Sequence, residues 1–140
     1  MLTKKKLAQG VAELASRDAD LAAVIDKHGQ PPLWSRKPGF PTLVQIILEG
    51  LSRLSDAEAK KALTSLVGIG RWPADIYLLM ALRRPDIWPK GDLALAKAAQ
   101  QVKGLEALPD QDQLEELAES WQPWRAVAAR VLWLHYLSRD

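Results

Sequence analysis

Asp92 is the acidic residue of this chain whose setting best suits chemistry. It follows a loop that holds Pro85, Pro89 and Gly91, and it stands at the start of an apolar helical pattern. A carboxylate placed there can stabilise positive charge on a substrate, and it can orient or deprotonate a water molecule. An aspartate that opens a helix also caps free N–H groups. Both roles are compatible, because one carboxylate oxygen can cap while the other faces a substrate.

A Gly-Ile-Gly turn at Gly68, Ile69 and Gly70 precedes this loop. Its two glycines allow positive φ values, and the turn exposes successive N–H groups at the start of the following helix. That arrangement suits a phosphate group, and Arg71 adds positive charge. We expect Ile69 to point inward and join the two flanking helices. A turn of this kind also occurs in ordinary connections between helices. Taken alone, it therefore favours a purely structural turn over a phosphate site.

These residues need helices to position them, and apolar spacing predicts helices along most of the chain. No period-2 pattern predicts a strand. Helices are predicted at residues 3–15, 17–28, from 41 onward, 55–67, 72–82, 92–102, 109–120 and 123–137. The intervening segments 29–40 and 83–91 are loops rich in proline and glycine. We therefore expect one all-α domain of seven or eight short helices over residues 1–140.

Composition narrows the possible classes of site. The chain has 140 residues, a net charge of +2, two histidines and no cysteine. The lack of cysteine excludes disulfides, thiolate metal sites and cysteine-ligated iron–sulfur clusters, and two histidines make a poor zinc site. No apolar run reaches the about 18 residues of a membrane span. We expect a cytoplasmic protein with no metal and no cofactor, and a low net charge still permits a basic DNA-binding patch.

The longer string around the turn, LVGIGRWPADIYLL, resembles the helix-hairpin-helix signature of a DNA glycosylase superfamily. That superfamily pairs the hairpin with a Gly/Pro-rich loop and a catalytic aspartate, and RRPDIWPKGD carries these residues in the same order. Two further segments, PPLWSRKPGFPTLVQIILE and AESWQPWRAVAARVLWLHYL, are similar to the alkylpurine (3-methyladenine) branch. The resemblance covers roughly residues 31–137.

The resemblance implies an activity and a partner. It implies hydrolysis of the N-glycosidic bond of alkylated purines in base excision repair, with Asp92 as the catalytic carboxylate. It also implies binding of double-stranded DNA, with a backbone phosphate held by the turn Gly68–Gly70 and by Arg71. A bacterial-type, nucleoid-associated protein is the corresponding expectation for its location.

Trp72 occupies the position where bifunctional members such as endonuclease III carry a Schiff-base lysine. The resemblance therefore implies base release by water without strand cutting, because an indole supplies no amine. Trp72 and Trp124 are also candidates for an aromatic pocket around the flipped base, although core packing is the alternative for each. Among the other tryptophans, packing is favoured for Trp34, Trp121 and Trp133. Trp88 lies in the loop and suits either role.

The chain departs from the family pattern near residue 50. Glu49 runs directly into Gly50, where the family continues with several more helices and with the residue that wedges into the duplex. Leu51 is a candidate for that wedge. Pro73 also replaces the usual threonine, and a proline is tolerated in the first turn of a helix. We interpret the chain as a shortened glycosylase-like domain.

The short middle segment predicts a partner copy. Without the missing helices, apolar residues such as Leu43, Ile46 and Ile47 would be exposed, and exposed apolar patches usually contact another surface. We expect a homodimer, with domain swapping near Gly50 as one way to form it.

Three functions remain open from the sequence, and the glycosylase is the first expectation. The second is a DNA-binding module that kept the hairpin and lost turnover. The third is a remnant of the fold. An assay of base release separates the first from the others, and the salt dependence of DNA binding tests the second.

Overall fold

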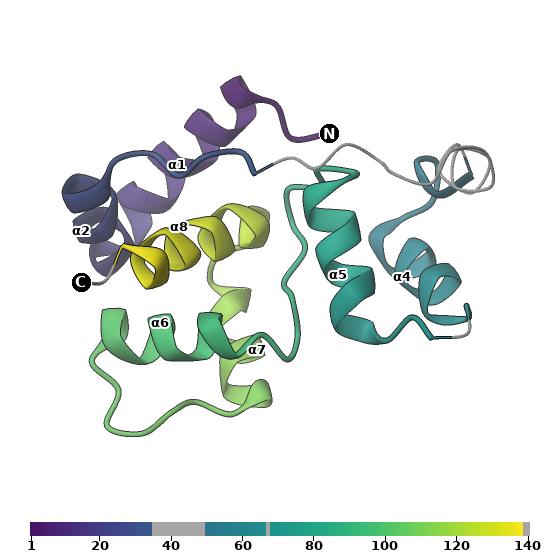
Figure 1. Cartoon of the computed structure of the whole chain (residues 1–140). Coiled ribbons are helices and arrows are strands. Elements are labelled where there is room, and N and C mark those ends of the chain that lie inside the picture. Colours follow the sequence, from purple (N-terminus) through teal and green to yellow (C-terminus); the bar gives the residue numbers. More distant parts are fainter. Residues whose placement is uncertain (35–49, 67, 139–140) are drawn as a thin grey trace.

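The described part of the chain is built from helices. The computed structural model describes residues 1–34, 50–66 and 68–138, and no strand occurs within those ranges. The all-α prediction is confirmed, while the helix predicted from residue 41 lies outside the described residues. The helices are shown in Figure 1: α1 (Lys4–Arg17), α2 (Ala19–His28), α4 (Asp56–Thr64), α5 (Arg71–Met80), α6 (Leu93–Lys103), α7 (Gln111–Glu119) and α8 (Arg125–Leu137).

Side-chain caps set where several helices begin. The Asp18 side chain accepts from the N–H groups of Asp20 and Leu21, so α2 begins at Ala19 rather than at the predicted residue 17. Asp110 caps α7 in the same way and moves its start to Gln111. Ser55 and Glu58 form a capping box at the start of α4. Local hydrogen bonds therefore account for small shifts of the predicted boundaries.

Helix α8 lies at the centre of the core, between the α1–α2 pair and α6 (Figure 1). Its alanines and small aliphatic residues are buried on most sides, which lets the neighbouring helices approach closely. Gly10 on α1 is one point of close approach, since a Cβ atom there would lie 2.8 Å from the Trp124 ring. Small residues thus fix the spacing of α1 and α8.

A buried arginine joins α8 to α5. The side chain of Arg130 is fully buried, and its guanidinium donates to the carbonyl groups of Leu33, Ala126 and Leu79 at 3.0, 2.9 and 3.0 Å. Leu79 lies in the last turn of α5, where carbonyl groups carry partial negative charge. Burial lowers the pKa of Arg130 to about 10. This contact ties the helix that follows the glycine turn to the centre of the core.

A second arginine anchors the chain just before α4. One Nη atom of Arg84 donates to the carbonyl groups of Leu51 and Leu54, at 2.6 and 2.8 Å. The other Nη atom pairs with Asp56 at 2.7 Å. Helices α4 and α5 also contact each other along the hairpin (Figure 1). The hairpin is therefore held at both its entry and its exit.

Candidate functional site

Asp92 opens helix α6, as predicted, and its carboxylate is held by two donors. Asp92 as a whole is 8% exposed. Oδ1 accepts from the backbone N–H of Leu95 at 2.9 Å, and Oδ2 accepts from the indole N–H of Trp72 at 3.0 Å. Both oxygens therefore act as acceptors, as an ionised carboxylate does. One oxygen caps the helix, and the other is oriented by Trp72.

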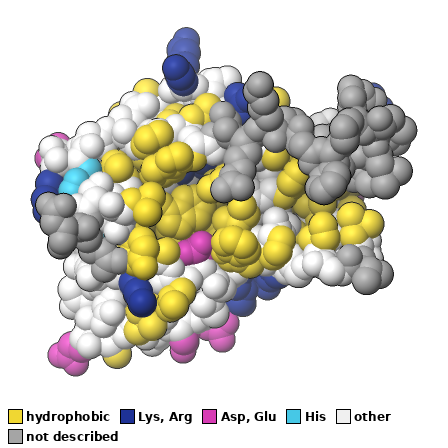
Figure 2. All heavy atoms as spheres, in the orientation of Figure 1, with side chains coloured by type: hydrophobic (Ala, Val, Ile, Leu, Met, Phe, Trp, Pro, Cys, Tyr) yellow, Lys and Arg dark blue, Asp and Glu magenta, His cyan; other side chains and the backbone are white. Residues whose placement is uncertain are grey.

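The surroundings of this carboxylate are partly apolar and open. Trp72 is 45% exposed, so it is not packed in the core, and Leu93 is 56% exposed. Trp72 occupies the second position of α5 and reaches across to the start of α6. Figure 2 shows hydrophobic side chains gathered across the middle of one face, with an acidic side chain among them. An exposed aromatic ring and a largely buried carboxylate thus lie together.

The glycine turn lies directly before Trp72. Gly68 has a φ of +86°, and no atom lies within 4 Å of where its Cβ would be, so the requirement for glycine is conformational. Gly70 is the N-cap of α5, and within the described chain no side chain caps this helix. Ile69 is half-buried against the core, and Pro73 is the third residue of α5, within its first turn. The first N–H groups of α5 therefore remain available to an anion, less the one that Pro73 lacks.

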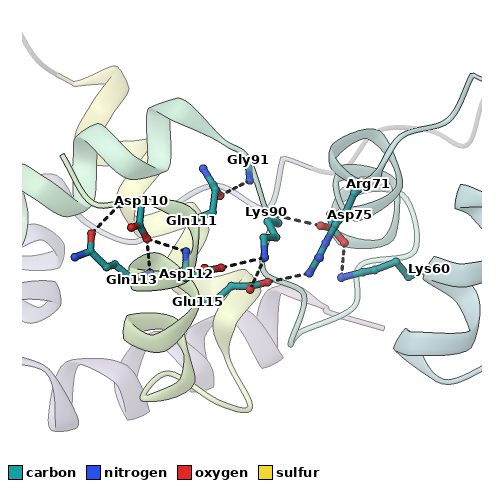
Figure 3. A network of polar contacts seen from close by, with 10 residues as sticks. All are labelled: Lys60, Arg71, Asp75, Lys90, Gly91, Asp110, Gln111, Asp112, Gln113 and Glu115. Carbon is teal, nitrogen blue, oxygen red and sulfur yellow. Dashed lines mark hydrogen bonds and ion pairs between the residues drawn. The ribbon is translucent and has the colours of Figure 1, made fainter.

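Arg71 lies at the start of α5 and is paired with a carboxylate of α7. Its Nη2 atom is 2.8 Å from Oε1 of Glu115, while Lys90 Nζ is 2.7 Å from Oε2 of the same side chain. The hydrogen bond to Glu115 raises the pKa of Lys90, and the hydrogen bond from Lys90 lowers the pKa of Glu115. Figure 3 shows this cluster joining α5, the loop before Asp92 and α7. Nothing in the local sequence pattern singles out Lys90 or Glu115.

The loop that carries Asp92 is fixed at its beginning by the start of α8. The carbonyl of Pro85 accepts from the N–H of Ala126 at 3.0 Å. The Asp86 carboxylate receives two hydrogen bonds from the Arg125 guanidinium, at 2.8 and 2.9 Å. Bidentate pairs of this kind fix orientation as well as distance. The loop therefore starts from a defined place on the core.

The end of the same loop is fixed by aromatic packing and by two side-chain acceptors. The rings of Trp88 and Trp121 pack with centroids 5.5 Å apart, so both serve packing. The N–H of Lys90 donates to Oδ2 of the fully buried Asp75 at 3.2 Å. The N–H of Gly91 donates to Gln111 at 2.6 Å. Asp92 consequently follows a segment with little freedom to move.

Asp75 also connects the two helices of the hairpin. Its Oδ1 atom lies 2.6 Å from Nζ of Lys60 on α4, an ion pair whose angle does not suit a hydrogen bond. Asp75 itself is on α5 (Figure 3). The hairpin and the loop before Asp92 thus share one buried carboxylate.

Two predicted site residues lie in the core. Trp124 is 9% exposed, packs against Gly10 and donates its indole N–H to Glu13 at 2.6 Å. Leu51 is 3% exposed, and its carbonyl is bound by Arg84. The structure therefore brings together Trp72, Asp92 and the glycine turn. The base-pocket role of Trp124 and the wedge role of Leu51 stay predictions. Each role needs an accessible side chain, and both side chains are buried in this structure.

Two other classes of site do not occur among the described residues. They hold no group of three or more histidine, aspartate or glutamate side chains arranged for a metal ion. Within the same ranges, no helix combines the length and the apolar character needed to cross a bilayer.

Comparisons with known sequences point to one group of proteins. No protein-family model matches the chain. Similar curated proteins include the alkylbase DNA glycosidase-like protein mag2 of Schizosaccharomyces pombe (31% identity over 83 residues) and the DNA-3-methyladenine glycosylase of Bacillus subtilis (29% over 85). A third is the DNA-3-methyladenine glycosylase 1 of S. pombe (33% over 85). The matches cover 59%, 61% and 61% of this chain but only 39%, 28% and 37% of the relatives.

Solved structures share the fold over more of the chain. The DNA-3-methyladenine glycosidase of Bacillus halodurans aligns with a TM-score of 0.66 at 18% identity, covering 92% of this chain and 87% of the other. The S. pombe 3-methyladenine DNA glycosylase Mag1, solved in complex with abasic DNA, aligns with a TM-score of 0.57 at 24% identity. That alignment covers 91% of this chain and 77% of the other. The arrangement of helices is therefore that of these two proteins.

Proposed function

Because the chain belongs to the helix-hairpin-helix 3-methyladenine DNA glycosylase family, we propose that it is a monofunctional DNA glycosylase acting on alkylated purines. The observation that carries the proposal is the pairing of Asp92 with Trp72, at 3.0 Å, beside the glycine turn. It places an acceptor carboxylate next to an exposed aromatic ring and next to helix N–H groups. In this arrangement the aromatic ring suits a base, the carboxylate suits the charged sugar, and the helix N–H groups suit a backbone phosphate.

In the proposed reaction, the bond between the purine nitrogen and the deoxyribose C1′ breaks, and its electron pair leaves with the base. Positive charge develops on the sugar, and the Asp92 carboxylate stabilises it. A water oxygen then forms the new bond to C1′, and the carboxylate accepts or directs the proton that the water loses. Leu95 and Trp72 hold the two oxygens in place during these steps.

Residue 72 also limits the chemistry. A glycosylase that cuts the strand uses an amine to form a Schiff base with the opened sugar. Trp72 has no such group, and its N–H donates to Asp92. We therefore expect an abasic site as the product, with the strand intact.

Double-stranded DNA is the proposed partner. The related Mag1 structure is a complex with abasic DNA. In this chain, the turn at Gly68–Gly70 and the uncapped start of α5 provide N–H groups that suit a backbone phosphate. The protein would therefore act in a compartment that contains DNA.

Trp72→Phe removes the indole N–H but keeps an aromatic ring beside Asp92. We expect base release to slow by about tenfold, because Asp92 Oδ2 loses the donor that orients it. Affinity for undamaged duplex should change little, since the glycine turn, Arg71 and the backbone N–H groups at the start of α5 are kept. Trp133→Phe, a buried tryptophan in α8, is the matched control. The measurement is the single-turnover rate of base release. An unchanged rate for Trp72→Phe would show that the hydrogen bond does not contribute to catalysis.

The direct test of the proposal is release of a methylated purine from duplex DNA. We expect free base from the wild-type protein, and we expect strand breaks only after alkaline cleavage of the abasic product. Absence of base release, together with DNA binding that weakens with salt, would support a binding module instead. The burial of Trp124 and Leu51 favours that second candidate, because a base pocket and a wedge must both be accessible.

The predicted homodimer stays a prediction. The apolar residues that suggested it, Leu43, Ile46 and Ile47, lie outside the described residues. Its test is the mass of the protein in solution.

A further inference from the structure

Two cations from different elements meet on one carboxylate beside the hairpin. Arg71 Nη2 is 2.8 Å from Oε1 of Glu115, and Lys90 Nζ is 2.7 Å from Oε2. Arg71 is the first residue of α5, Lys90 lies two residues before Asp92, and Glu115 belongs to α7 (Figure 3). Each cation thus binds a different oxygen of the same anion.

This cluster is accessible from solvent. The side chains of Arg71, Glu115 and Lys90 are 50%, 38% and 25% exposed. Arg71 and Glu115 also line a groove of about 400 Å³, whose other charged residues are Lys60, Arg125, Asp56, Asp86 and Glu119. The exposure of the three side chains gives an anion from solvent access to both cations without any movement of the core.

We propose that Arg71 and Lys90 form a contact for one phosphate of the DNA backbone, and that the Glu115 carboxylate occupies this contact when DNA is absent. The inference rests on the proposed function and extends it to Lys90 and Glu115. A phosphodiester presents two non-bridging oxygens with one negative charge, so it can replace a carboxylate that bridges two donors. When DNA binds, the phosphate pairs with the guanidinium and the ammonium groups, and the Glu115 side chain moves out toward solvent.

The Arg71–Glu115 pair is exposed, and the Lys90–Glu115 pair is partly buried. Exposed pairs contribute little to stability, so breaking one costs little when another anion replaces it. Both partners are charged at neutral pH, since their hydrogen bond raises the pKa of Lys90 and lowers the pKa of Glu115. Asp112, 3.6 Å from Lys90, is 93% exposed and offers a weaker alternative partner. Glu115 therefore acts as a competitor that reduces DNA affinity.

The test is a double-mutant cycle on DNA binding. Wild type, Glu115→Gln, Arg71→Gln and the double variant are titrated with a short labelled duplex at several salt concentrations. Glu115→Gln should bind roughly threefold to tenfold more tightly than wild type, because the competing charge is gone. Glu116→Gln is the matched control for net charge, as Glu116 is an exposed neighbour on the same helix. In the Arg71→Gln background, the gain from Glu115→Gln should shrink, because only the competition for Lys90 remains.

Two outcomes overturn the inference. One is an affinity of Glu115→Gln equal to or lower than that of Glu116→Gln. The other is a gain that persists undiminished without Arg71, which would reflect only a general charge effect. If Glu115→Gln does not fold, as judged by thermal unfolding, Lys90→Gln decides the question: the inference requires weaker binding and a salt slope reduced by about one. Wild-type protein that binds no duplex even at low salt would refute the proposed function itself.

Discussion

Replacing Asp92 with asparagine is expected to slow base release by about 10²–10⁴-fold while the protein remains folded. The change removes the negative charge that stabilises the sugar as the base departs. It also leaves a side chain that cannot accept a proton from the attacking water. Base release is the step in which Asp92 has its proposed role, so the rate should respond far more than DNA affinity.

The local structure explains why folding should survive this substitution. Asparagine caps helices about as well as aspartate, so the N–H of Leu95 keeps an acceptor. An amide has only one acceptor oxygen, however, and Trp72 presents a second N–H at 3.0 Å. The new amide would therefore satisfy one of the two donors and place its amino group against the other. A modest loss of stability is expected alongside the large loss of rate.

Asp110→Asn is the matched control for Asp92→Asn. Asp110 is also an N-cap, for α7, where it accepts from the N–H groups of Asp112 and Gln113, and it is exposed. The same chemical change there should leave the rate of base release unaltered. The measurement is the single-turnover rate on duplex DNA that carries one methylated purine. An Asp92→Asn protein with half or more of the wild-type rate would refute the catalytic role of Asp92.

The features predictable from the sequence were those set by neighbouring residues. The capping box at Ser55, the start of α6 at Asp92 and the glycine turn depend on residues only a few positions apart. Such contacts leave a local signal in residue type and spacing. Helix ends shifted by about two residues where a cap such as Asp18 competed with the apolar pattern.

The contacts that assemble the site could not be predicted in this way. Trp72 meets Asp92 across 20 positions, and Arg71 meets Glu115 across 44. No periodicity connects such residues, because their proximity depends on how the helices pack. The burial of Trp124 has the same origin, since it follows from the close approach of α1 at Gly10. The sequence thus indicates the chemical groups but not the network that holds them.

Arg130→Ala is expected to lower the free energy of unfolding by about 3–5 kcal/mol, a large effect for a single substitution. The substitution would leave the buried carbonyl group of Leu79 and the partly buried one of Leu33 without their donor, and it would open a cavity inside the core. Arg53→Ala is the control, because Arg53 is exposed and should change stability by no more than about 0.5 kcal/mol. Urea denaturation followed by circular dichroism gives both values, and a loss below about 1 kcal/mol for Arg130→Ala contradicts the expectation.

A second substitution at Arg130 separates the effect of the lost contacts on stability from the cost of burying a charge. Its folded-state value of about 10 is below the usual value, so burial disfavours the charged form. That cost is fully present below pH 10 and is relieved as the pH rises further. Arg130→Met fills much of the volume without a charge, so it should destabilise less than Arg130→Ala. Equal losses in the two variants would mean that the unsatisfied carbonyl groups dominate and that the guanidinium is held at α5 by hydrogen bonding rather than by packing.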